Sequence, residues 1–296
     1  MKRNALQILL LIIIAVVTLT GCNETESQVI TEEIVIENSQ GTYTKGEIII
    51  PKDYEDEKLP LITLGHGYGG TMDSAGGKEL AENLAKAGFA TVRMDYDHFV
   101  SENLEKQTHQ YTVDTMVSDQ ILCIEYMVEH YNVDADRIGL YGRSLGGRVA
   151  MEMANESEGG YAYKALALIA PAGNGNALAY YMHGEDKWQD MKAEAETKGY
   201  VTHQDVKLTP EFFTSVDDYV PSENGYKFNN PVLVIYNTLD YVVLPETSKE
   251  CAQAYENSEE IEVTTKNYHG YEMGYENSEL KDMLTERIIN FFKENI

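Results

Sequence analysis

Cysteine is scarce in this sequence, with three in 296 residues, at positions 22, 123 and 251. No CxxC spacing and no neighbouring histidine cluster is present, so nothing supports a metal site or a bound cofactor. Cys123 and Cys251 both fall in helical patterns, and we expect two buried small hydrophobic side chains there. The sequence alone leaves open whether these two cysteines form a disulfide.

Positive charge is also scarce. Lysine and arginine total 23 against 49 aspartates and glutamates, which gives a net charge of -26 at pH 7. Such a surface repels phosphate backbones and anionic lipid headgroups, so nucleic acid is excluded as a partner and membrane attachment would require a lipid. Acidity can signal disorder, but 43% of the residues are hydrophobic and apolar runs recur, which favours a folded domain with a solvated acidic surface.

A long apolar run occurs only near the start, at residues 8–17, behind the charged Lys2 and Arg3 and ahead of the tetrapeptide LTGC at 19–22. The run is too short to span a bilayer comfortably, and the pattern is typical of a secretory signal. The tetrapeptide resembles a bacterial lipobox. We therefore expect residues 1–21 to be a lipoprotein signal peptide and Cys22 to carry the lipid, on the extracytoplasmic side of a bacterial cell envelope. An ordinary secretory signal with an incidental cysteine is the alternative.

Residues 22–33 are polar and acidic, as expected of a tether, and from residue 34 short apolar runs alternate with longer amphipathic segments. This alternation predicts an α/β fold, a mainly parallel sheet with helices on both faces, over residues 34–296. The roughly sixty residues between two of the strands predict a small helical cap inserted at about 172–229. The expected strands are 43–50, 61–65, 89–94, 137–141, 164–170, 231–236 and 260–264, and the expected helices 76–87, 112–131, 145–157, 246–256 and 279–294.

The stretch IGLYGRSLGGRVAMEMA, residues 138–154, begins as a strand and ends as a helix, with Ser144 at the junction inside a GxSxG motif. The motif alone is weak, but a strand-turn-helix with no spare residues is the turn that exposes a nucleophilic serine. Gly142 and Gly146 are expected there because a Cβ would strike the neighbouring strand or helix. We predict that Ser144 is a nucleophile.

A serine nucleophile needs a base, and the base needs an acid to orient it. Asp240 stands four residues past a strongly apolar strand, and His269 stands five past the next one. Enzymes whose nucleophilic serine lies on such a strand-turn-helix have their catalytic residues in the chain order Ser, Asp, His, so we predict these three as the catalytic set. The rival acids are Asp95 and Asp97, and the rival histidines are His66, His98, His109, His130, His183 and His203.

The loop LGHGYGG follows the strand at 61–65 and has no phosphate-binding spacing. A tetrahedral intermediate needs two backbone N–H groups to meet its negative oxygen. We predict that one comes from Leu145, directly after the nucleophile, and the other from Tyr68 in this loop.

The segments HGYGG, DADRIGLYGRSLGG, ALALIAPAG, YNTLDYVV and YHGY together resemble the α/β-hydrolase superfamily over nearly the whole chain after the signal. Within it the chain is most similar to small carboxylesterases of the cinnamoyl and feruloyl esterase type, which share the HGxGG loop and an inserted cap. The segment DADRIGLYG also resembles acetyl xylan esterases, dienelactone hydrolases and the catalytic domain of prolyl oligopeptidases. One departure is that Tyr236 and Asn237 occupy the turn that often reads HG in this superfamily.

The resemblance implies a serine carboxylesterase that acts on a small-molecule ester, with cinnamoyl, feruloyl or acetyl esters as candidates. Aromatic residues of the cap could line the pocket or form the cap's own core: Tyr180, Tyr181, Trp188, Phe212, Phe213 and Tyr219. Two alternatives remain. One is a serine peptidase like the prolyl oligopeptidases, although the chain lacks room for their large N-terminal domain. The other is a non-catalytic binding lipoprotein.

Overall fold

The computed structural model describes residues 28–38, 41–52, 54, 58–99, 106–107 and 111–296. The predicted signal peptide and Cys22 lie outside these residues and stay predictions. In the described part of the chain, no helix is both long and apolar enough to cross a membrane.

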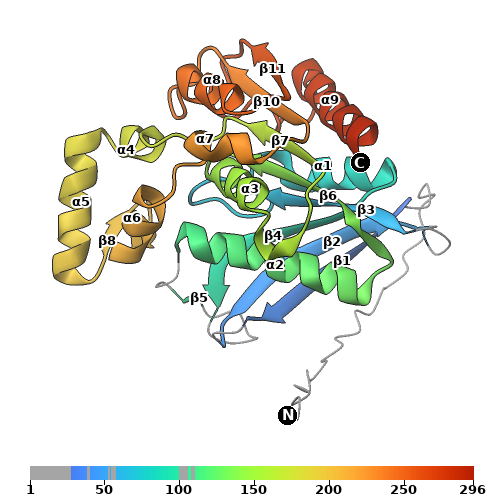
Figure 1. Ribbon diagram of the computed structural model, residues 1–296, viewed down its shortest axis with the longest axis horizontal. Helices are drawn as coiled ribbons and strands as arrows, with labels where there is room; N and C mark the ends of the chain where they lie inside the picture. The colour runs from blue at the N-terminus through green and yellow to red at the C-terminus, as the bar shows by residue number, and fades with distance from the viewer. Residues whose placement is uncertain (1–27, 39–40, 53, 55–57, 100–105, 108–110) are drawn as a thin grey trace.

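Nine strands of the described chain form one twisted sheet at the centre of the molecule (Figure 1). Their order is β1-β2-β4-β3-β6-β7-β10-β11, with β5 paired to β4. The pairs from β4 to β11 along this order are parallel, and only the pairs at the β1 end are antiparallel. The predicted mainly parallel α/β fold is confirmed. The strands are β1 (Val29–Glu37), β2 (Tyr43–Pro51), β3 (Leu59–Gly65), β4 (Ala90–Phe99), β5 (Lys106–Gln107), β6 (Val133–Arg143), β7 (Ala165–Ile169), β10 (Val232–Asn237) and β11 (Ser258–Val263).

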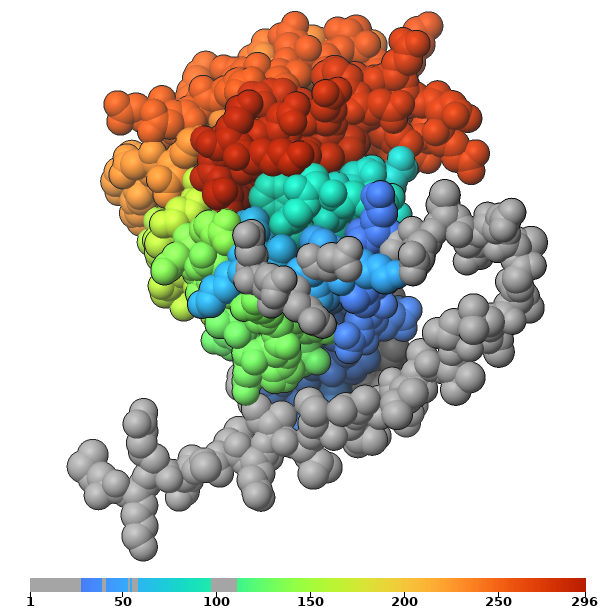
Figure 2. Space-filling view, turned by 90° about the vertical axis from the view of Figure 1, so that its right-hand side faces the viewer, coloured from blue at the N-terminus to red at the C-terminus, as the bar shows by residue number. Residues whose placement is uncertain are grey.

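Helices cover both faces of the sheet and bury two separate apolar clusters. Helices α1 (Gly77–Lys86) and α9 (Glu279–Asn295) pack on one face. Figure 2 shows α9 in red beside the teal segment that contains α1, with the first strands in blue. Helices α2 (Val113–His130), α3 (Leu145–Glu156) and α8 (Pro245–Gln253) pack on the other face. Cys123 of α2 and Cys251 of α8 are buried there as free thiols, as expected of small hydrophobic residues.

The first strand corrects the predicted tether. The tether predicted at residues 22–33 overlaps this strand, because β1 begins at Val29 and pairs with β2 from Val29 opposite Pro51 to Glu37 opposite Tyr43. Only Ile34 of this strand is buried, because β1 lies at the edge of the sheet. The exposed, acidic side chains of β1 resemble those of a linker, but backbone hydrogen bonds to β2 hold this segment in the sheet.

The segment between β7 and β10, which we call the cap segment (residues 172–229), lies to one side of the sheet (Figure 1). Helices form there as expected, but the segment also contains a two-stranded antiparallel sheet that the helical prediction missed. Its elements are α4 (Ala177–Tyr181), α5 (Glu185–Lys198), β8 (Val201–His203), β9 (Val206–Leu208), α6 (Pro210–Asp217) and α7 (Pro221–Asn224). The short 3-10 helix η3 (Gly225–Lys227) also lies in the cap segment, whereas η1 (Ser74–Gly76) and η2 (Glu158–Gly160) lie outside it.

Three aromatic side chains form the core of the cap segment. Trp188, Phe212 and Phe213 are at most 2% exposed. The ring centroids of Trp188 and Phe213 are 4.8 Å apart, and those of Phe212 and Phe213 are 5.6 Å apart, both in edge-to-face geometry. Such pairs stabilise beyond the area they bury. These three residues are therefore buried in one aromatic cluster, which continues from Phe212 to Tyr68 and Tyr111 outside the cap segment and joins the core beneath it.

Arg148 of α3 joins the cap segment to the central domain. Its Nη1 donates hydrogen bonds of 3.3 Å to the carbonyls of Ala172 and Asn174, and its Nη2 donates to those of Val216 and Tyr219. The side chain is fully buried. Burial lowers the pKa of Arg148 to about 10, so the guanidinium stays charged at neutral pH. One cation thus holds both ends of the cap segment against the helix that follows Ser144.

Candidate active site

Ser144 occupies the turn between β6 and α3 in a strained conformation. Its φ is 54° and its ψ is -118°, a region that non-glycine residues rarely adopt. The Ser144 N–H donates to the carbonyl of Ile169 at 2.9 Å, and the Ser144 carbonyl accepts from the N–H of Ala172 at 3.1 Å. Strand β7 and the chain beyond it therefore hold the strained residue in place, and this is the turn that the motif predicts.

The glycines around Ser144 permit close backbone approach, as predicted. A Cβ on Gly142 would lie 2.3 Å from the carbonyl oxygen of Gly146, and one on Gly146 would lie 2.4 Å from that of Gly65. A Cβ on Gly147 would lie 3.0 Å from the Cα of Pro171. Real Cβ atoms do not approach backbone within about 3 Å, so β3, β6 and α3 could not pack this closely with any other residue at 142 and 146.

Asp240 and His269 form a hydrogen-bonded pair. Asp240 follows β10, His269 follows β11, and the distance from His269 Nδ1 to Asp240 Oδ2 is 2.8 Å. The Asp240 side chain is fully buried, whereas 20% of the His269 side chain is exposed. The other carboxylate oxygen accepts from the N–H groups of Val242 and Val243 at 2.8 and 3.1 Å. An acid held in this way keeps the proton of His269 on Nδ1 and leaves Nε2 as the acceptor.

Two residues that the sequence analysis missed support this pair. The Tyr271 hydroxyl donates to Asp240 Oδ2 at 3.1 Å and accepts from the Asn237 N–H at 2.9 Å. Burial raises the pKa of Tyr271 further above its usual value, so the phenol remains a donor. The Asn237 side chain donates to the carbonyls of Thr265 and Tyr268 at 2.9 and 2.6 Å. Asn237 thus joins the loop that carries Asp240 to the loop that carries His269. In the sequence, the YHGY motif was only a weak signal for the role of Tyr271.

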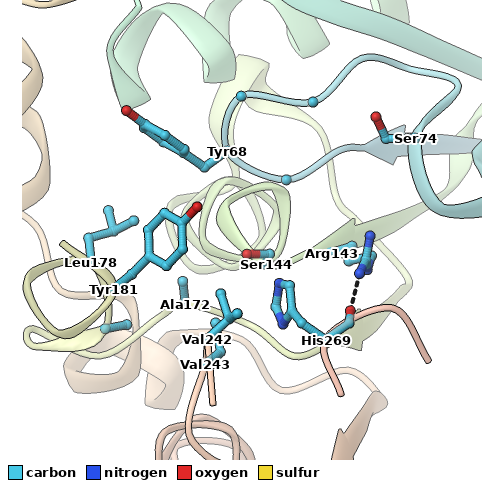
Figure 3. A pocket seen from close by; sticks show the side chains of 14 residues that line it. Tyr68, Ser74, Arg143, Ser144, Ala172, Leu178, Tyr181, Val242, Val243 and His269 are labelled. Carbon is cyan, nitrogen blue, oxygen red and sulfur yellow. Dashed lines mark hydrogen bonds between the residues drawn. The ribbon is translucent and has the colours of Figure 1, made fainter. Parts of the chain in front are cut away.

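Ser144 and His269 line one pocket of about 220 Å³ (Figure 3). Arg143 lines it too, and its Nη2 donates a hydrogen bond to the carbonyl of His269. Of the six cap aromatics considered above, Tyr181 is the one that lines this pocket. The other lining residues are Gly67, Tyr68, Gly69, Gly70, Ser74, Ala172, Ala177, Leu178, Val242 and Val243. The structure therefore brings Ser144, His269 and Asp240 together from three separate loops.

Tyr68 lies in the glycine-rich loop after β3, beside Ser144. A Cβ on the adjacent Gly67 would lie 3.3 Å from the Cβ of Ser144, so the loop contacts the serine directly. Among the described residues, neither the Tyr68 N–H nor the Leu145 N–H has a hydrogen-bond acceptor. The Tyr68 hydroxyl donates to the His203 carbonyl of the cap segment at 3.1 Å, which the sequence did not predict. This hydrogen bond attaches the glycine-rich loop to the cap segment.

The rival residues have other positions. His66 Nε2 accepts from the Tyr96 N–H at 3.2 Å, and Asp95 accepts from the Met72 N–H at 2.7 Å. Both side chains therefore have backbone partners of their own. The described residues hold no group of three or more acidic, histidine or cysteine side chains placed to bind a metal. Asp97 and His98 lie at the end of β4, where only the backbone is described, and His109 lies outside the described residues. His130 lies on α2, and His183 and His203 lie in the cap segment.

The strand order and the strained serine after β6 define the α/β-hydrolase fold. The sequence model of the prolyl oligopeptidase family matches residues 79–296, well over half of the chain. The chain belongs to this family and is a hydrolase-type enzyme.

Bacterial relatives of this chain have low sequence identity to it. An uncharacterised 31.7 kDa protein of Escherichia coli, from the traX-finO intergenic region, is 26% identical over 65% of this chain and 76% of its own length. An acyl transferase of Aliivibrio fischeri is 26% identical over 49% of this chain and 45% of its own length.

Solved structures share the fold. Est1E of Butyrivibrio proteoclasticus, with ferulic acid bound, has a TM-score of 0.70 at 21% identity, and the match covers 88% of this chain and 98% of Est1E. An acetyl xylan esterase of Paenibacillus sp. R4 has a TM-score of 0.66 at 15% identity and covers 93% of this chain and 87% of its own.

Proposed function

We propose that this chain is a serine carboxylic-ester hydrolase that acts through an acyl-enzyme. Ser144 is the nucleophile, His269 the general base and Asp240 the acid that orients His269. One observation carries the proposal: a strained serine shares its pocket with a histidine whose other ring nitrogen lies 2.8 Å from a buried carboxylate. Serine nucleophiles are activated by such an arrangement.

The chemistry follows from these positions. His269 Nε2 takes the proton of Ser144 as the serine oxygen bonds to the ester carbonyl carbon, and the N–H groups of Leu145 and Tyr68 stabilise the resulting oxyanion. Collapse of this intermediate breaks the bond to the alcohol oxygen, which receives the proton from His269. Water then attacks the acyl-enzyme by the same route, releasing the acid and restoring Ser144.

The pocket favours a small substrate. Its volume of about 220 Å³ lies below the range of about 300–1,000 Å³ that is usual for drug-sized ligands. Three of the cap aromatics that could have enclosed a feruloyl ring, Trp188, Phe212 and Phe213, are buried and do not line the pocket. Within the proposal, a short or acetyl ester therefore fits better than a cinnamoyl ester.

Family membership favours a second candidate, a serine peptidase that uses the same three residues. The two activities share the acyl-enzyme, and they differ in the leaving group that His269 must protonate. Hydrolysis of a prolyl amide at a rate near that of an ester would establish the peptidase.

The test is the kcat/KM of the purified chain for methyl acetate, methyl ferulate and a prolyl amide, with the variant Ser144→Ala as control. We expect the short ester to be hydrolysed best and the variant to be inactive. A fluorophosphonate probe should label the wild type and not the variant. Activity that survives in Ser144→Ala would refute the proposed nucleophile, and failure of both turnover and labelling would favour the non-catalytic binding lipoprotein.

We also propose that the enzyme is held at the outer face of a bacterial membrane by a lipid on Cys22. The lipobox-like segment at 19–22 supports this. Metabolic labelling with radioactive palmitate in a bacterial host should mark the wild type and leave Cys22→Ser unlabelled. Equal labelling of both would refute the anchor.

A further inference from the structure

Arg143 is an unpaired cation in the wall of the candidate active site. Among the residues that line the pocket it is the one charged side chain besides the titratable His269, and none of the lining residues is acidic. Within the described chain its guanidinium makes one hydrogen bond, from Nη2 to the carbonyl of His269. Its Nε is buried and has no partner. Burial lowers the pKa of Arg143, but an arginine remains charged at neutral pH.

The two fully buried arginines, Arg93 and Arg148, make more contacts than the half-buried Arg143 does, although Arg148 Nε also has no partner. Arg93 forms ion pairs with Glu47 and Asp73, and Arg148 donates to four backbone carbonyls. The chain has 49 acidic residues, yet no described carboxylate lies within ion-pair distance of Arg143. A largely desolvated cation with a single hydrogen-bond acceptor is costly, and a ligand carboxylate in the pocket would supply the missing acceptors.

Ser74 adds a second donor on the same side of the pocket. Its Oγ accepts from the Thr71 N–H at 2.9 Å, so the hydroxyl hydrogen remains available, and no described residue accepts it. A small cavity of about 20 Å³, lined in part by Gly67, Ser74 and Arg143, extends this side of the pocket. That volume is sufficient for about one water molecule or one ligand oxygen.

The two sides of the pocket differ in polarity. Figure 3 shows Arg143 and Ser74 on one side of Ser144, and Leu178 and Tyr181 on the other. A substrate seated on Ser144 thus meets hydrogen-bond donors in one direction and an apolar wall in the other.

We propose that the substrate is a small ester that carries a carboxylate, which binds Arg143 and Ser74 while the apolar portion lies against Leu178. This inference rests on the proposed ester hydrolase function. The planar guanidinium matches the two oxygens of a carboxylate, and a hydrogen bond between charged groups is stronger than one between neutral groups. A neutral ester would leave the charge of Arg143 unpaired, and a cationic ester would be repelled by it.

The test compares esters of equal shape and different charge. Acetoxyacetate is paired with isobutyl acetate, and monomethyl succinate with methyl isocaproate, so that the carboxylate lies on the alcohol side in one pair and on the acyl side in the other. The kcat/KM of each ester is divided by its rate of hydroxide-catalysed hydrolysis. We expect the anionic ester of at least one pair to be preferred by about tenfold to a hundredfold.

The variant Arg143→Gln keeps a side-chain N–H for the His269 carbonyl and removes the charge. Any effect on the position of His269 acts on both esters of a pair, so the ratio isolates the charge. We expect the preference to fall to about one. Arg137→Gln, which removes an equal charge from the exposed start of β6, should leave the ratio unchanged.

Equal rates for both esters of each pair in the wild type, or a preference that persists in Arg143→Gln, would overturn the inference and leave the ester hydrolase standing. A chain that cleaves the prolyl amide and neither pair of esters would overturn the proposed function, and this inference with it.

Discussion

Glu152 makes the stability of the protein depend on pH in an unusual direction. This residue lies in α3, two turns after Ser144, and is 9% exposed. Its Oε2 is buried without a hydrogen-bond partner. Burial raises the pKa of Glu152 from 4.5 to about 7, and the attraction of Arg148 one turn earlier only partly opposes this rise.

The direction of this pH dependence follows from the pKa of Glu152 in the folded and unfolded states. The folded state holds the Glu152 proton more tightly than the unfolded state, so the contribution to stability is fully present below pH 4.5 and is lost as the pH rises through about 7. A rise of roughly 2.5 pKa units corresponds to about 3 kcal/mol, since each unit equals about 1.4 kcal/mol. Most of this loss, about 2 kcal/mol, falls between pH 5 and pH 8.

The variant Glu152→Gln keeps the shape of the protonated side chain and removes its titration. We expect the free energy of unfolding of the variant, relative to wild type, to increase by about 2 kcal/mol from pH 5 to pH 8, as measured by urea denaturation at each unit of pH. Glu156→Gln is the matched control. Hydrogen bonds from Lys227 and Tyr219 lower the pKa of Glu156, so its relative stability should be nearly constant above pH 5. Parallel stability profiles for wild type and Glu152→Gln would refute the reasoning.

Three further predictions concern the site. Gly146→Ala places a Cβ 2.4 Å from a backbone oxygen and should lower stability by about 1–3 kcal/mol or more, whereas Gly274→Ala, with nothing within 4 Å, should change the urea midpoint little; equal midpoints would contradict the close packing. Asp240→Asn should reduce kcat by about ten-thousandfold at unchanged fold, because an amide no longer holds the His269 proton on Nδ1; a loss under tenfold would remove Asp240 from the proposed set. Tyr271→Phe should reduce kcat several-fold and lower stability by about 1 kcal/mol, through loss of its hydrogen bonds; unchanged values of both would show that its hydroxyl is dispensable.

The sequence predicted the central strands and the helices that cover them because burial imposes a strong local pattern. Strand β7 is buried at all five positions, and its apolar run is visible in the sequence. The strands that were missed are β1, β5 and the β8–β9 hairpin. Strand β1 buries only Ile34, and the hairpin is three residues long on each side, so pairing rather than burial defines them.

The positions of Ser144, Asp240 and His269 could also be predicted, because parallel strands deliver the loops that follow them to one edge of the sheet. The supporting residues could not. Asn237 acts through contacts with Thr265 and Tyr268 in the next loop, and these pairings depend on how two loops fold against each other. No local spacing encodes such a contact.

Helix α3 and the residue before it contain three unfavourable features: the strained backbone at Ser144, the desolvated cation of Arg148 and the carboxyl group of Glu152, whose Oε2 has no hydrogen-bond partner. All residues of α3 except the last, Glu156, are buried, so the packing of the helix between the sheet and the cap segment offsets these costs. The strain exposes the proposed nucleophile, and Arg148 attaches the cap segment that forms the apolar wall of the pocket. Glu152 performs neither task in the described structure. Glu152→Gln should therefore gain stability relative to wild type between pH 5 and pH 8 while ester turnover is unchanged.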